Sequence, residues 1–447
     1  MFFLTIGMVI LFAISMLITK GDIFRPSVIV SAVMLAASIS ACYLEQVWNF
    51  TLLPVTAFLL SLSVGVIIFV DSLCYATTRD RRSIGSIHNN SLGTIEVKRG
   101  IIFLVIVFDT VTFVMHYKYL IDAVGTGSIF SMATTYRMLT VAETLKSSMP
   151  SLLSRFIRLD QNFAYIFLYI GINNTILKRK LKGNTVNFIP VTLYIVDSLL
   201  TGARGYLMYL VFAALIYSYF IMQRKTGWTY SVSHKFIKIV CAVGVVGAIV
   251  FTFIGGSLGR TQSASLLLLI SRYLGGGIVL LNDFLSGNLS HSNSFGSATF
   301  VALYNFLSRR IGIDNPSLEY TQFEFRYRQG TNWGNVYTPL RRYYTDFGLC
   351  GVMILSALFA LFFGIYYARL KKRQGHNNKV DFSLLYYGYF ARSLFLFFFD
   401  DRLFYEFCTP SLIIYVIECY VCLVIVVRGQ APLKFKRNLS LKRAADF

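Results

Sequence analysis

The chain has 447 residues, of which 55% are apolar and 16% aromatic, and its formal net charge is +21. This composition excludes a soluble multidomain protein, because water-facing domains could not bury so much apolar surface. The apolar runs are long and unbroken instead of alternating, so they predict helices that span a membrane.

Eleven stretches are long enough to cross a bilayer, which takes about 17–25 residues each. They are 2–19, 27–44, 52–70, 101–120, 161–177, 186–201, 205–223, 239–257, 348–368, 382–399 and 410–427. The first has no basic residue before it and Lys20 after it, the reverse of a cleaved signal peptide. We therefore expect an all-α, polytopic protein with a single integral membrane domain over residues 1–447.

The distribution of basic residues predicts the orientation of the chain. Of the 42 lysines and arginines, 26 lie in alternate connections, at 20–26, 79–99, 178–182, 224–238, 369–379 and 428–443. Cytoplasmic loops carry such an excess, so these segments are predicted to face the cytoplasm, with the N-terminus outside and the C-terminus inside. The net charge thus reflects topology, and we expect no nucleic-acid partner.

Two outer connections are long enough to hold a site, at 121–160 and 258–347. The second contains apolar stretches on either side of Gly275, Gly276 and Gly277. If this stretch crossed the membrane, one of the strongly basic segments 224–238 and 369–379 would face the outside. We therefore expect a re-entrant or interfacial hairpin, hinged at the glycines and bordering a cavity that opens outward.

Lysine and arginine are distributed unequally between the two sides. The inner segments hold 14 Lys and 12 Arg, whereas the outer ones hold 14 Arg and only Lys118 and Lys146. Arginine grips phosphate or carboxylate with a planar fork, so the outer face is predicted to bind anions. The alternative is that these arginines pair with outer carboxylates.

Six outer arginines close to the membrane are the candidate anion ligands: Arg204, Arg260, Arg272, Arg341, Arg342 and Arg392. Arg204 lies between two glycines in a short turn, where the backbone can approach a ligand, and Asp197 is a candidate to orient it. Arg392 lies inside a predicted span and should face a cavity or a partner. Its structural alternative is a pair with Asp109 or Glu418.

A transferase or hydrolase also needs a general base. Candidates in the large outer loop are Asp283, His291, Asp314, Glu319, Glu324 and Asp346. We favour Asp283, which follows the glycines, and His291, whose ordinary pKa is nearest neutrality. Asp400 and Asp401 are followed by Arg402, which favours ion pairing. The sequence has no nucleotide-binding loop and no metal-ligand pair, so no cofactor and no metal are expected.

Three short stretches give the sequence a family resemblance. They are the turn Thr201-Gly202-Ala203-Arg204-Gly205, the segment Arg272-Tyr273-Leu274-Gly275-Gly276, and Asn335-Val336-Tyr337-Thr338 followed by Tyr344-Thr345-Asp346-Phe347-Gly348. With these motifs and its late outer loop, the chain resembles bacterial O-antigen polymerases of the Wzy type. The resemblance also makes Tyr273 a candidate orienting residue.

The resemblance implies a transfer on the periplasmic face of the bacterial inner membrane. A glycan on undecaprenyl pyrophosphate would move to the distal sugar of another carrier-linked repeat unit, with arginines stabilising the pyrophosphate leaving group. The implied partners are lipid-linked donor and acceptor, membrane lipid, and a chain-length regulator and a flippase. A lipid-linked oligosaccharide flippase or transporter, the O-antigen ligase and a non-enzymatic assembly protein are the alternatives.

Overall fold

A computed structural model describes most of the chain. The described residues are 1–78, 92–141, 149–178, 184–228, 235–244, 246–247, 265–287, 292, 294–328, 331–373 and 379–427. Predicted span 239–257 therefore lies largely outside them, and so do the candidate site residues Arg260 and His291.

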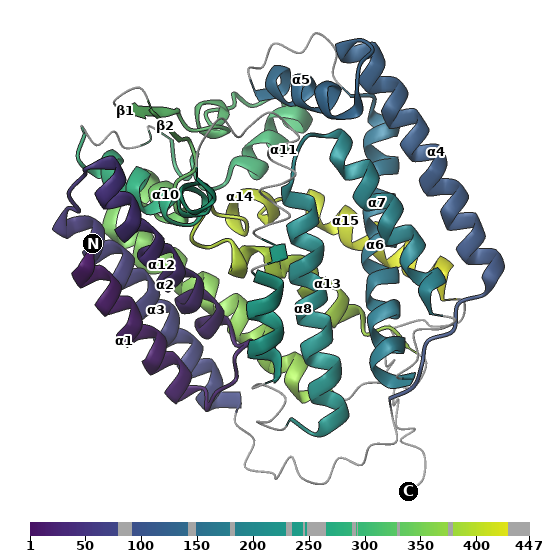
Figure 1. Cartoon of the computed structure of the whole chain (residues 1–447), viewed down its shortest axis with the longest axis horizontal. Coiled ribbons are helices and arrows are strands. Elements are labelled where there is room, and N and C mark those ends of the chain that lie inside the picture. Colours follow the sequence, from purple (N-terminus) through teal and green to yellow (C-terminus); the bar gives the residue numbers. More distant parts are fainter. Residues whose placement is uncertain are drawn as a thin grey trace, which may run out of the picture.

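The described chain is helical apart from one short hairpin (Figure 1). Its larger helices are α1 (Phe2–Ile18), α2 (Pro26–Trp48), α3 (Pro54–Thr78), α4 (Arg99–Val124), α5 (Ile129–Val141), α6 (Ser151–Lys178), α7 (Ile189–Leu200), α8 (Gly205–Thr226), α10 (Leu266–Leu285), α11 (Val301–Ile311), α12 (Pro339–Lys372), α13 (Phe382–Phe395) and α15 (Ser411–Val426). The shorter elements are η2 (Thr185–Phe188), η3 (Leu318–Tyr320), α14 (Phe404–Phe407), and the antiparallel strands β1 (Arg326–Arg328) and β2 (Thr331–Gly334).

Six of the described helices are long and apolar enough to cross a membrane: α2, α3, α4, α8, α10 and α12. Shorter apolar helices are found at α1, α7 and α15. The protein is thus an all-α, multi-pass membrane protein. Every predicted span except 239–257 coincides with a helix, although α13 ends at Phe395, earlier than expected.

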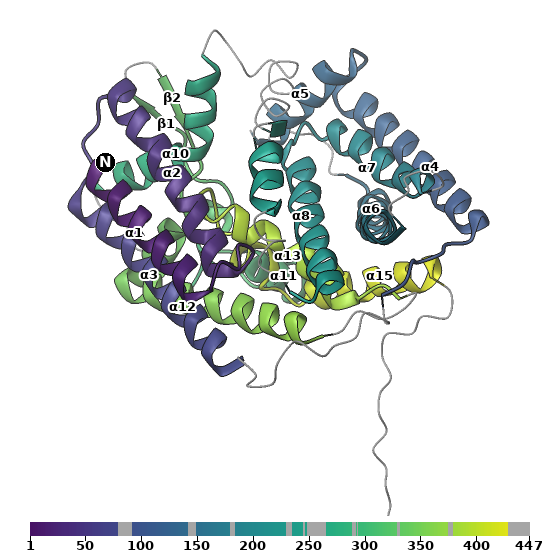
Figure 2. The same ribbon diagram turned by 60° about the horizontal axis from the view of Figure 1, so that its bottom comes forward.

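The helices form two groups that meet along α8 and α13 (Figures 1 and 2). In one group α3 packs against α12, and α2 packs against both α1 and α10. In the other, α6 contacts α4, α7, α8 and α15. Aromatic side chains fill the junction: Phe220 of α8 lies 5.1 Å from Tyr367 of α12 and 6.0 Å from Tyr387 of α13, between ring centroids.

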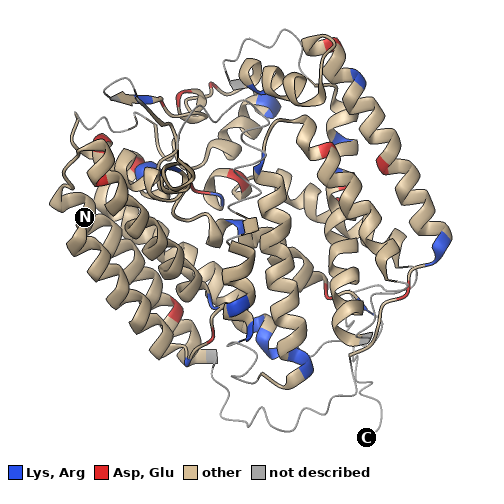
Figure 3. Cartoon of the chain, viewed as in Figure 1, with Lys and Arg blue, Asp and Glu red and all other residues tan. Residues whose placement is uncertain are grey.

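The two ends of the molecule differ in charge. At one end, which we call the hairpin end, the N-terminal amine is 3.1 Å from Glu45 at the end of α2, and Trp48 stacks on Trp333 of β2. At the opposite, basic end, lysines and arginines gather at the ends of α8 and α12 (Figure 3). Ion pairs between Lys371 and Asp22, and between Arg224 and Asp381, tie this end together. The N-terminus, β1 and β2 thus share one end, as the charge pattern predicted.

The structure corrects the expected hinge at the three glycines. Helix α10 runs without interruption through Gly275–Gly277. A Cβ atom on Gly275 would lie 2.5 Å from the Ala41 amide nitrogen of α2, and one on Gly277 would lie 2.7 Å from the Phe398 carbonyl oxygen. These glycines therefore allow backbones to approach closely and do not bend the chain.

A bend does occur inside α12, at Gly348. This residue adopts φ 59° and ψ −146°, which separates a first segment beginning at Pro339 from the long apolar segment that follows. Only glycine adopts such backbone angles readily. The bend lies where the predicted span 348–368 begins, and it leaves Arg341 and Arg342 on the segment at the hairpin end.

Candidate functional site

The turn that carries Arg204 is pressed against α5. Gly202 has φ +62°, and a Cβ atom on it would lie 2.5 Å from the Ala133 carbonyl oxygen, so no larger residue fits there. The chain re-enters helix at Gly205, with Arg204 as the preceding, buried residue. The turn thus holds Arg204 at the end of α8 opposite Arg224, which is the hairpin end.

Two residues predicted for the site meet here. The Nη2 atom of Arg204 donates a hydrogen bond to the hydroxyl of Tyr273 at 2.6 Å, and the guanidinium lies 5.3 Å from the Tyr273 ring centroid. This contact joins the turn before α8 to α10 across 69 residues of sequence. Tyr273 therefore orients Arg204.

Arg272 precedes Tyr273 in α10 and is half-buried. Within the described part of the chain it takes part in no ion pair. A partly desolvated guanidinium without a carboxylate is a suitable position for an anionic ligand.

Arg341 belongs to a chain of charges that also contains Asp283. Its Nη2 atom lies 2.7 Å from one oxygen of Glu324 and 2.9 Å from the other. Arg326 contacts Glu324 at 2.8 Å and Asp283 at 3.5 Å. The predicted base Asp283 is thus linked to Arg341 through Glu324 and Arg326.

A second chain of charges joins Arg342 to Arg392. Arg342 lies 3.2 Å from Asp400, and Arg402 bridges Asp400 at 3.5 Å and Glu406 at 2.5 Å. Glu406 in turn lies 2.6 Å from Arg392. The pairing of Arg402 with Asp400 was predicted. The partner of Arg392 is Glu406, not Asp109 or Glu418, and Glu418 pairs instead with Arg158 at 3.2 Å.

The pKa values of two acids in this region shift in opposite directions. Burial favours neutral Glu406, but the charges of Arg392 and Arg402 outweigh it and lower the pKa of Glu406. Burial, reinforced by the neighbouring charge of Asp400, raises the pKa of Asp401 to about 7. Asp401 accepts amide hydrogen bonds from Leu403 and Phe404 through Oδ1, while its Oδ2 is unpartnered among the described residues.

These pairs separate the candidate arginines into two sets. Arg341, Arg342 and Arg392 are matched with carboxylates, as the ion-pair alternative expects. Arg272 has no such ion pair among the described residues, and Arg204 lies beside it through its hydrogen bond to Tyr273.

Two of the remaining candidates, Asp346 and Asp197, have structural partners of their own, whereas Asp314 and Glu319 are exposed. Asp346 accepts hydrogen bonds from the Ser292 hydroxyl and from the amides of Ala298 and Thr299, so it organises the chain before α11. Asp197 does not lie in the arginine chains: its Oδ1 is 2.9 Å from Nδ1 of His116 in α4.

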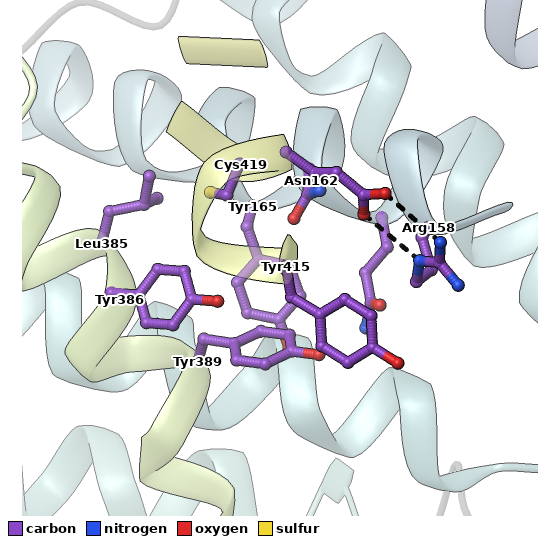
Figure 4. A pocket seen from close by; sticks show the side chains of 10 residues that line it. Arg158, Asn162, Tyr165, Leu385, Tyr386, Tyr389, Tyr415 and Cys419 are labelled. Carbon is purple, nitrogen blue, oxygen red and sulfur yellow. Dashed lines mark hydrogen bonds and ion pairs between the residues drawn. The ribbon is translucent and has the colours of Figure 1, made fainter. Parts of the chain in front are cut away.

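A small cavity lies between α6, α13 and α15 (Figure 4). About 20 Å³ of it is available to the centre of a water molecule, enough for about one water. Tyr165, Tyr386, Tyr389 and Tyr415 line it beside the Arg158–Glu418 pair. Tyr389 also packs 4.6 Å from the Arg392 guanidinium, measured to the ring centroid, so the cavity adjoins the second chain of charges.

Sequence reasoning missed Glu406 and did not connect four groups inside the membrane. His116 and Asp160 join Asp109 and Asp197 between α4, α6 and α7. The sequence did contain one sign of this cluster: Asp109 and His116 are spaced so that they lie on one face of an apolar helix. No pattern in the sequence pointed to Glu406 as the partner of Arg392.

No family model matches the chain, and neither the curated proteins nor the solved structures contain a significant match.

Proposed function

We propose that this protein joins lipid-linked oligosaccharide repeat units, in the manner of the polymerases that the sequence resembles. The observation that carries the proposal is the Arg204–Tyr273 hydrogen bond, with Arg272 beside it. It brings together two of the three motifs behind the resemblance, at the end opposite the basic residues.

In the proposed reaction, a hydroxyl of the acceptor sugar attacks the anomeric carbon of the donor. The carbon–oxygen bond to the lipid pyrophosphate breaks, and the hydroxyl proton passes to a carboxylate, for which Asp283 is our candidate. Arg204 and Arg272 hold the pyrophosphate and stabilise its growing charge. The donor supplies the energy of the reaction, so the proposal uses no cofactor and no metal.

The proposal includes the finer topology. It comprises eleven spans in a bacterial inner membrane, a periplasmic N-terminus and hairpin end, and a cytoplasmic C-terminus. His291 and Arg260, outside the described residues, stay in the proposed site as a second base candidate and a further anion ligand. Donor, acceptor, membrane lipid, a chain-length regulator and a flippase are the proposed partners.

Replacing Arg204 or Arg272 by Ala tests the proposal. Each change should lower the polymerisation rate about a hundredfold, about 3 kcal/mol in the barrier, because the arginine contact strengthens as the leaving group gains charge. Lysine should rescue only in part, because it lacks the bidentate fork. The assay is extension of purified lipid-linked repeat units, together with the surface-glycan ladder of a strain that carries the variant.

Arg309→Ala is the matched control, because Arg309 is an exposed arginine at the end of α11. It should leave the ladder unchanged. Normal ladders from both Arg204→Ala and Arg272→Ala, at normal protein levels in the membrane, would refute the assignment.

Transport of a lipid-linked glycan is a second candidate, favoured by the acidic groups buried between α4, α6 and α7, since such groups occur in transporters. Loss of each function would change the surface glycan in a different way. Loss of a polymerase leaves single repeat units on the cell surface, whereas loss of the flippase leaves none. Loss of a ligase leaves polymer on its lipid carrier.

A further inference from the structure

A row of polar side chains runs along the buried face of α4. Asp109, Thr112 and His116 follow one another at spacings of three and four residues, which places them on one side of the helix. Each is at most 1% exposed. Because α4 is among the helices apolar enough to span a membrane, these groups lie where polar side chains are costly and usually functional.

Neighbouring helices add two more buried carboxyls to this row. Asp160 of α6 interacts electrostatically with Asp109, and Asp197 of α7 with both. Asp197 also contacts His116 at 2.9 Å. The carboxyls of Asp109 and Asp160 face one another closely enough to share a proton, and within the described structure neither has any other hydrogen-bond partner.

No lysine or arginine among the described residues pairs with these three carboxyls. Asp71, another buried acid on an apolar helix, does have such a partner and lies 3.1 Å from Arg25. Three adjacent carboxylates without a cation would cost several kcal/mol each in an apolar surrounding. The group therefore needs bound protons or another cation to exist in the membrane.

Other titratable groups around the row do not supply a positive charge to balance the three carboxylates. Tyr194 of α7 and Tyr136 of α5 are phenols on helices that pack against α4. Arg158 of α6 is engaged with Glu418 of α15. Lys118, on α4 itself, is exposed on another side of the helix.

Two further atoms in the row indicate what it binds. Thr112 Oγ1 and His116 Nε2 are both buried, and neither has a hydrogen-bond partner in the described parts of the chain. A hydroxyl can donate or accept a hydrogen bond, and an imidazole nitrogen can also bind or release a proton. The described acidic, cysteine and histidine side chains include no group that converges to hold a metal ion.

We propose that Asp109, Asp160, Asp197 and His116 form a proton-binding site within the membrane. The facing carboxyls of Asp109 and Asp160 hold the bound proton, beside the contact between His116 and Asp197. Protons are taken up from water and returned to it, so no other reactant is needed. The site is separate from the arginines of the hairpin end and does not depend on the proposed glycan transfer.

Infrared spectroscopy of the purified full-length protein in lipid bilayers tests this inference directly. Protonated buried carboxyls should give a carbonyl-stretching band at about pH 7 that is lost at high pH. Asp109→Asn and Asp160→Asn should each remove part of that band. Asp71→Asn should not, because the Asp71 carboxylate is held in an ion pair with Arg25. Absence of the band from wild-type protein at neutral pH would overturn the proposal, whatever the variants do.

Thermal unfolding separates a proton from a metal cation. Asparagine mimics a protonated aspartic acid, so Asp109→Asn and Asp160→Asn should unfold within a few degrees of wild type, whereas Asp71→Asn should unfold much earlier. Changing sodium for choline at constant pH should leave the unfolding temperature unaltered. A sodium-dependent shift that Asp109→Asn abolishes would identify a sodium site and refute the proton site.

Discussion

Arginines at the hairpin end are positioned by aromatic rings as well as by carboxylates. The guanidinium carbon of Arg341 lies 3.8 Å from the ring centroids of both Phe323 and Tyr337. That of Arg392 lies 4.8 Å from the centroid of the Tyr209 ring. A planar guanidinium can stack flat on a ring, whereas the ammonium of lysine contacts a ring only as a point charge. The residue type is therefore set by packing as well as by charge.

Asp401 should make stability depend on pH. Its pKa is raised to about 7 in the folded protein by burial and by Asp400, above the ordinary value in the unfolded chain. The folded state then binds the Asp401 proton more tightly than the unfolded chain does. The contribution of this proton to the free energy of unfolding is complete at low pH and is lost as pH rises from about 4 to about 7. Between about pH 5 and pH 8, the wild-type protein should therefore lose about 2–3 kcal/mol more of its free energy of unfolding than Asp401→Asn does.

Equilibrium unfolding in mixed micelles at several pH values measures this effect. Asparagine can still accept the amide hydrogen bonds of Leu403 and Phe404, so the variant isolates the charge. Equal pH profiles for wild type and Asp401→Asn would show that Asp401 is ionised throughout.

At the scale of elements, α10 depends on two glycines and tolerates a side chain at a third. A Cβ atom on Gly275 would lie 2.5 Å from the backbone of α2, so Gly275→Ala should cost about 1–3 kcal/mol by forcing the helices apart. Gly276 has no atom within 4 Å of a Cβ position, so Gly276→Ala should stabilise the helix by up to about 1 kcal/mol.

The comparison of these two alanine variants is internally matched, since both lie in the same turn of α10. Unfolding temperature in detergent is the measurement. Equal destabilisation by both changes would favour the hinge that the sequence suggested over the close packing of α10 on α2.

For the whole molecule, the proposed topology places the basic end in the cytoplasm. Arg309 of α11 and Arg369 near the end of α12 are exposed and lie at opposite ends. After replacement of the exposed cysteines Cys241, Cys350 and Cys408 by serine, a membrane-impermeant thiol reagent should label Arg309→Cys in intact cells. Arg369→Cys should react only after the membrane is opened. If only Arg369→Cys were labelled in intact cells, the orientation would be the opposite of the proposed one.

The sequence by itself determined where most of the long apolar helices lie and which of their ends gather together. Hydrophobic length is a local property, because each span must satisfy its own backbone hydrogen bonds in lipid. The alternation of basic connections likewise follows from the order of the spans, so α1 could be placed with β1 and β2 before any contact was known.

Only the tertiary structure decided which charges meet and what the glycines do. His116 and Asp197 are 81 residues apart, and Arg204 and Tyr273 are 69 apart. Partners at such separations depend on how whole helices pack, which spacing along one helix does not encode. The same reason explains the hinge that was wrongly predicted at Gly275: a glycine run allows a bend or a close approach, and the α2 backbone packed against α10 selects the close approach.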